Sequence, residues 1–208
     1  MEQVLDVYQR PFDEQQPLIC LDERPTQLLG NVTDSVIKSD GSRLIDYEYE
    51  RHGVVQVVMC FAPLLGQRHV IVKQRNTKAD WVANVVYLLD EVYPHCRAIT
   101  LVQDNHSAHK PEAFYEFYPP QKARAYLDRI EFQFTPPHGS WLNMAEFELS
   151  VLSRQLLNKR CGGQQELFRH ITTWQKQRNK AKVKANWRFT TCDARDKLKY
   201  LYPHNSTC

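Results

Sequence analysis

Two apolar stretches decide the fold, PLICLDERP at residues 17–25 and AITLVQDNHSAH at residues 98–109. Each has the length and composition of a buried strand, and each ends at a carboxylate, Asp22 in the first and Asp104 in the second. If the two strands are neighbours in an α/β sheet, these carboxylates converge at the edge of the sheet where ligands of such folds bind.

The other elements follow from hydrophobic periodicity and from turn residues. They are a strand at 44–63 broken near His52–Gly53, a strand at 68–75, a helix at 78–93, a helical stretch divided at Pro119–Pro120, a strand at 130–136 and a helix from 141. A capping box from Thr77 to Asp80 starts the first helix, and Ser140 is expected to cap the last. The stretch TDSVIKSDGSR at 33–43 is predicted to form a loop.

This order predicts an α/β fold of the ribonuclease H-like type. Its sheet has five strands, three antiparallel and then two parallel, and helices flank it. We assign this core to residues 1–160 and expect residues 161–208 to form a basic helical extension packed on the same domain.

Two neighbouring carboxylates repel each other unless they share a proton or bind cations, and hard oxygen ligands suit Mg²⁺ or Mn²⁺. A third carboxylate from the helix after residue 140 would complete a site for two ions about 4 Å apart, which supports phosphodiester cleavage. Glu146 and Glu148 are the candidates, at opposite borders of an apolar arc that includes Trp141. Asn143 lies beside Glu146 and slightly favours it, but helical geometry leaves the choice open. The position of Trp141 favours core packing over stacking on a DNA base.

Basic charge is concentrated near the C-terminus. Residues 154–200 contain 13 Lys/Arg and 3 Asp/Glu, although the chain has a net charge of only +3. Such a run is often a solvated helix face, but here the cations alternate with Trp174, Trp187 and Phe189, which suits nucleic acid. The candidate DNA-binding residues are Lys176, Arg178, Lys180, Lys182, Lys184 and Arg188.

Four ordered motifs resemble the catalytic half of insertion sequence 630 family transposases, relatives of the mariner transposases. They are CLDERPTQLLG, LVQDNHSAH, FTPPHGSWLNMAEFELSVLSRQ and WRFTTCDARDKLKYLYP, and the resemblance extends from about Val4 to Pro203. It implies that Asp22, Asp104 and Glu146 form the catalytic and metal-binding triad. It also implies metal-dependent cleavage of DNA at transposon ends, followed by attack of the 3′ hydroxyl on target DNA, typically at TA.

The family's full-length members carry helix-turn-helix DNA-binding segments ahead of the catalytic domain, whereas this chain begins almost directly at the first catalytic strand. We therefore expect this N-terminal region to be absent, and a separately encoded DNA-binding half or a homodimer are partners to test. The alternatives are an inactive truncated transposase that only binds DNA, and a nuclease on the same fold.

Histidines surround the second carboxylate. An Asp/His zinc site at Asp104, His106, His109 and His138 can be considered, but its spacing is loose. Asn105 and His109 are better candidates for orienting Asp104 or contacting a phosphate.

The chain shows neither a membrane-spanning run nor a signal pattern, so we expect it in the bacterial cytoplasm, on nucleoid DNA when bound. Its six cysteines contain no C-x-x-C pair, which favours reduced thiols over a disulfide framework or a zinc knuckle.

Overall fold

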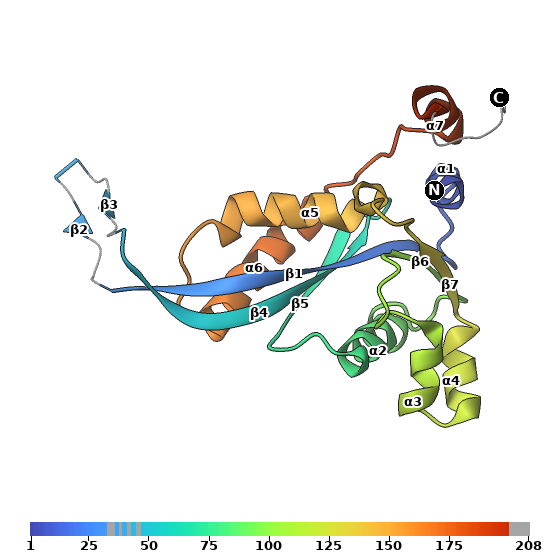
Figure 1. The fold of residues 1–208 in the computed structure, drawn as a ribbon, viewed down its shortest axis with the longest axis horizontal. Coiled ribbons are helices and arrows are strands. Elements are labelled where there is room, and N and C mark those ends of the chain that lie inside the picture. The colour runs from blue at the N-terminus through green and yellow to red at the C-terminus, as the bar shows by residue number, and fades with distance from the viewer. Residues whose placement is uncertain (33–35, 38, 41–42, 45–46, 200–208) are drawn as a thin grey trace.

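The computed structural model describes residues 1–199 except 33–35, 38, 41–42 and 45–46. A five-stranded sheet in the order β5-β4-β1-β6-β7 forms its centre (Figure 1). The strands are β1 (Leu18–Asn31), β4 (Tyr49–Ala62), β5 (Gln67–Lys73), β6 (Ile99–Gln103) and β7 (Ile130–Phe134). β1, β4 and β5 are antiparallel, whereas β6 pairs in parallel with both β1 and β7. The predicted fold class is therefore confirmed.

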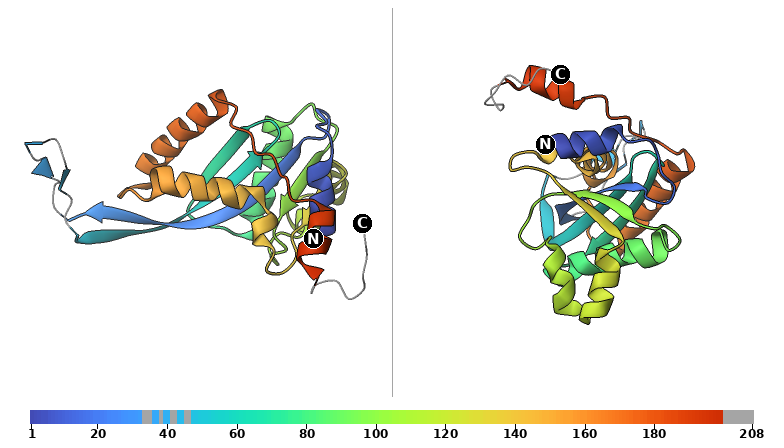
Figure 2. Two further views of the ribbon diagram at one scale, coloured as in Figure 1. Left: turned by 90° about the horizontal axis from the view of Figure 1, so that it is seen from above. Right: turned by 90° about the vertical axis from the view of Figure 1, so that its right-hand side faces the viewer.

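Helices cover both faces of the sheet (Figures 1 and 2). One side carries α1 (Glu2–Gln9), α5 (Met144–Leu152) and α6 (Gln164–Lys180), with α7 (Thr191–Lys197) packed on α1. The other carries α2 (Lys78–Tyr87), α3 (Phe114–Phe117) and α4 (Pro120–Leu127). The short elements are β2 (Val36–Ile37), β3 (Arg43–Leu44) and the turns η1 (Leu88–Val92), η2 (Pro111–Ala113), η3 (Ser140–Leu142) and η4 (Ser153–Leu157). No described helix is both long and apolar enough to span a bilayer.

β1 is longer than the sequence predicts. Its pairing with β6 ends at Cys20–Val102, but its pairing with β4 continues to Asn31. Asp22 therefore lies inside a strand and not at its end. β4 is also continuous through His52–Gly53, where the predicted break is wrong because Gly53 adopts a φ of 102° within the strand. The two strands form an arm that extends beyond the helices (Figure 1). Part of the predicted loop at 33–43 lies outside the described residues, and the prediction is wrong for Val36–Ile37, which pairs with Arg43–Leu44 as strands β2 and β3.

Helix starts were predicted with mixed success. α2 begins as expected, with the reciprocal Thr77–Asp80 capping box in place. The prediction that Ser140 caps the last helix is wrong, because residues 140–142 form a 3₁₀ turn and α5 begins only at Met144. Asn143, in an extended conformation, is the cap, and its side chain accepts a hydrogen bond from the Ala145 amide.

The cysteines are mostly thiols. Cys20, Cys60, Cys96 and Cys161 are free. Cys192 is disulfide-bonded, so the prediction of reduced thiols is wrong at that position.

Candidate active site

The strand pairing sets the direction of the first carboxylate. Asp22 pairs with Met59, which belongs to the core under α5, whereas Glu23 pairs with Val58, which belongs to the core under α2. Because cross-strand partners share a face, Asp22 points to the α5 side and Glu23 to the α2 side.

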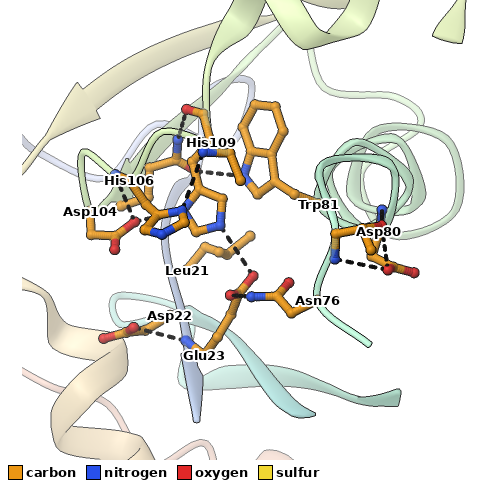
Figure 3. Close-up of polar contacts among 12 residues, drawn as sticks. Leu21, Asp22, Glu23, Asn76, Asp80, Trp81, Asp104, His106 and His109 are labelled. Carbon is orange, nitrogen blue, oxygen red and sulfur yellow. Dashed lines mark hydrogen bonds and ion pairs between the residues drawn. The ribbon is translucent and has the colours of Figure 1, made fainter. Parts of the chain in front are cut away.

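The second carboxylate reaches the same side by the same rule. Asp104 follows the end of β6 and lies two residues beyond Val102, just as Asp22 lies two residues beyond its partner Cys20. Figure 3 shows Asp22 and Asp104 on one side of β1 and Glu23 turned away from them. The predicted convergence at this sheet edge thus depends on where the β1–β6 pairing ends.

α5 supplies the third carboxylate. The Asn143 side chain donates to the backbone oxygen of Leu21 at 2.7 Å, which fixes the start of α5 beside Asp22. Glu146 lies in the first turn of the helix, and its Oε2 is buried without a hydrogen-bond partner. A buried, unpartnered carboxylate oxygen is unfavourable unless a cation binds it.

The pKa of Asp22 shows that the other two carboxylates lie near enough to repel its charge. Burial and the negative charges of Asp104, Glu146 and Glu23 raise the pKa of Asp22 from 3.8 to about 6. Like charges gathered in a partly desolvated place are typical of a site that binds a divalent cation.

His109 holds Asp104 in place. Its Nδ1 lies 2.6 Å from Asp104 Oδ1, and its Nε2 lies 3.5 Å from Glu23 Oε1 (Figure 3). Burial opposes a charge on His109, but these two carboxylates outweigh burial and raise its pKa to about 9. Although burial acts in the other direction, His109 also lowers the pKa of Asp104.

The ring of His109 is fixed from the α2 side. It stacks on Trp81 with ring centroids 5.7 Å apart. The Trp81 indole donates to Gln103, which in turn donates to the backbone oxygen of His109. The imidazole between Asp104 and Glu23 therefore has little freedom to turn.

Sequence reasoning missed Glu23 as a site residue. The sequence could have indicated it, because Glu23 directly follows Asp22 and successive side chains of a strand point to opposite faces of the sheet. The Asn105 side chain accepts a hydrogen bond from the Lys110 ammonium at 2.5 Å.

Glu148 occupies a different environment from Glu146. It is buried, and the guanidinium groups of Arg68 and Arg178 each donate to it at 2.6 Å. Arg68 is itself fully buried beneath the Phe61 ring. Glu148 is thus part of a buried ion-pair network, and Glu146 is the glutamate left for the site.

The predicted DNA-binding residues divide into two groups. Arg178 donates to Glu148, and its side chain is only 18% exposed, so it offers less to an open basic surface than the others. The other five are exposed on α6 and the segment after it, namely Lys176, Lys180, Lys182, Lys184 and Arg188.

Aromatic side chains lie near these cations. Trp141, predicted to favour core packing, is 40% exposed and stacks on Trp187 at a centroid distance of 6.2 Å. Phe147 and Phe189 extend the same cluster.

The donor set fits hard divalent cations. Asp22, Asp104 and Glu146 offer carboxylate oxygens, the ligands that Mg²⁺ and Mn²⁺ prefer. Among the described residues, the carboxylate oxygens of these three side chains do not all lie within 4.8 Å of one another. The three donors are therefore farther apart than in a closed metal cluster. The alternative of a zinc site at Asp104, His106, His109 and His138 likewise lacks such a cluster.

The fold and the three carboxylates define a class of nucleic-acid phosphodiester enzymes, and comparison with known families gives the family. Residues 17–168 match the model of the DDE superfamily endonucleases, and the chain belongs to that family. No curated protein matches the chain by sequence.

Solved structures of the Mos1 mariner transposase share the fold. A Mos1 paired-end complex with the left transposon end matches with a TM-score of 0.59 and 12% identity, over 88% of this chain and 55% of that one. A Mos1 paired-end complex with Mg matches with a TM-score of 0.56 and 14% identity, over 94% of this chain and 59% of that one. A Mos1 paired-end complex with Mn matches with a TM-score of 0.56 and 11% identity, over 88% of this chain and 55% of the Mos1 chain. The chain thus spans a little over half of the Mos1 chain.

Proposed function

We propose that the chain is the catalytic domain of a transposase that cuts DNA at transposon ends and joins the 3′ hydroxyl to target DNA, at a TA step. The observation that carries this proposal is the raised pKa of Asp22, which burial and the charges of Asp104 and Glu146 cause, together with the unpartnered oxygen of Glu146. Mos1 forms paired-end complexes with the left transposon end, with Mn and with Mg.

The protein's own groups have separate parts in this scheme. Asp22, Asp104 and Glu146 would hold two Mg²⁺ or Mn²⁺ ions, which activate the attacking oxygen and stabilise the leaving oxygen of an in-line displacement. His109 keeps the Asp104 carboxylate ionised and oriented. Asn143 fixes the helix that carries Glu146 to the strand that carries Asp22. None of these parts requires a covalent enzyme intermediate.

The test is incubation of the chain with a pre-cut transposon end and a TA-containing plasmid, with Mg²⁺, Mn²⁺ or EDTA. Joined products should appear with metal and disappear in Asp104→Asn, which keeps the side-chain volume but removes the charge. The matched control is Glu112→Gln, an exposed carboxylate on η2. Undiminished joining by Asp104→Asn would refute the triad. Cutting without joining would instead identify a nuclease on the same fold, and binding alone an inactive transposase.

We propose that a DNA-binding N-terminal half, as in the family that the motifs resemble, recognises the transposon ends and works with a homodimer of this chain in the bacterial cytoplasm. The proposal predicts that adding such a half makes cleavage depend on the end sequence. It also predicts a dimer on paired ends by light scattering. A partner that neither binds nor restores cleavage would refute it.

A further inference from the structure

Cys161, Glu166 and His170 form a second cluster of metal-ligand side chains, on the α5–α6 side of the sheet. One donor atom from each lies within 4.8 Å of the other two. Glu166 and His170 are four residues apart on α6 and so share one helix face. Cys161 precedes the helix, and its thiol lies 3.4 Å from Glu166 Oε2.

The cysteine is held in place by the backbone around it. Its carbonyl oxygen accepts from the Leu29 amide at 3.0 Å, at the point where the β1–β4 register shifts. The next carbonyl, that of Gly162, lies 2.6 Å from His52 Nδ1 on β4. Arg160 binds the backbone oxygens of Tyr47 and Glu48 across the same arm. A metal ligand on this segment would be positioned before any ion arrives.

We propose that Cys161, Glu166 and His170 bind one Zn²⁺ ion, with a solvent molecule as the fourth ligand. A thiolate, an imidazole and a carboxylate suit zinc and not magnesium. In a tetrahedral site with zinc–ligand distances of about 2.0–2.3 Å, donors lie about 3.5 Å apart. The cluster needs only a small contraction, which the exposed His170 can make by rotating its side chain.

Binding is coupled to the loss of one proton. Burial and the Glu166 carboxylate raise the pKa of the Cys161 thiol, so the free site carries S–H. Zinc replaces that proton on sulfur, forms the Zn–S bond and releases H⁺ to solvent.

The consequence of binding is structural. Zinc would fasten the first two turns of α6 to the 160–163 segment, which already binds β1 and β4 at the base of the arm. The site contains none of the triad residues and is independent of the chemistry proposed for them.

The test uses Co²⁺ as a spectroscopic probe on the full, untagged, metal-free chain with a phosphine reductant. One equivalent should give a thiolate-to-Co²⁺ charge-transfer band and tetrahedral visible bands, which Zn²⁺ removes. The bands should be lost in Cys161→Ser and in His170→Gln. They should persist in Cys96→Ser, which removes a different free thiol, and in Asp104→Asn, which alters the carboxylate site.

Stability gives a second measurement. Zn²⁺ should raise the unfolding temperature of the native chain and leave that of His170→Gln unchanged, and because His170 is exposed this variant should fold normally. Bands that are absent at one equivalent, or that survive Cys161→Ser, would overturn the proposal.

Discussion

Ionisation of the Asp22 carboxyl group is unfavourable in the folded chain, because the group is partly buried and lies near other carboxylates. A bound cation would offset this cost. Its pKa in the folded chain is about 6, against 3.8 for a free side chain. A raised folded pKa contributes stability at low pH that is lost as pH rises through about 6, at most about 3 kcal/mol by pH 7.

Asp22→Asn should therefore stabilise the metal-free chain at neutral pH, and the gain should shrink as the pH falls toward 4. Urea denaturation in EDTA across this range measures both curves. Parallel curves for the two proteins would show that Asp22 titrates normally. In the native chain, saturating Mg²⁺ should recover part of the same free energy, since it pairs the charge.

Removal of the Asn143 side chain is expected to lower the stability of the folded chain. Asn143→Ala deletes the α5 cap and the bond to the Leu21 carbonyl, so we expect a loss of about 1–3 kcal/mol in the free energy of unfolding. Strand transfer should fall more steeply than stability, because Glu146 loses its fixed position. Ser140→Ala is the control, since that side chain caps no helix. Equal effects of the two changes would contradict the role of Asn143.

Among the secondary-structure elements, α5 carries two glutamates with different roles: Glu148 in a buried ion-pair network and Glu146 in the candidate metal site. Glu148→Gln leaves the buried Arg68 and the partly exposed Arg178 without their anion, and breaking such a network costs about 3–5 kcal/mol. Glu146→Gln removes a charge with no hydrogen-bond partner at Oε2, so stability should hold while cleavage and joining disappear. Urea denaturation and the joining assay, run on both variants, separate the two roles. Loss of stability in Glu146→Gln with normal joining would reverse the assignment.

The strands and helices that sequence predicted well are those with a local signal. The box at Thr77 and Asp80 marks the start of α2, and the proline pair separates α3 from α4. The length of β1 has no such signal, because its second half contains Pro25 and Gly30, which are unusual in strands, and depends on pairing with β4. The start of α5 was misplaced because the 3₁₀ turn at 140–142 resembles a helix in its apolar spacing. Helical periodicity left Glu146 and Glu148 open, since their difference lies in Arg68, which is distant in the sequence.

At the scale of the whole molecule, basic charge is concentrated near the C-terminus, and most of the predicted DNA-binding lysines and arginines are exposed to solvent. If the exposed lysines after α6 contact phosphates, Lys180/Lys182/Lys184→Gln should weaken DNA binding at every sequence and reduce the salt slope by up to about 0.9 per contact. The matched control is Lys78/Lys122/Arg124→Gln on α2 and α4, across the sheet, which should change little. Affinity measured at several salt concentrations decides this, and equal losses in both variants would mean that binding is diffuse.

The long pairing of β1 with β4, which has one register shift between Gln27 and Leu29, also keeps Asp22 on the α5 face of the sheet. Asp22 and Glu23 are adjacent acids on opposite faces, so a slip of one residue would exchange them and present the wrong acid to α5. If β1 were held only by its three parallel pairs with β6, a slip of one residue would cost little free energy. Because the antiparallel pairing runs from Cys20 to Asn31, a slipped chain would misplace every buried side chain along it. The long antiparallel pairing therefore strongly favours the one register that presents Asp22, and not Glu23, to α5.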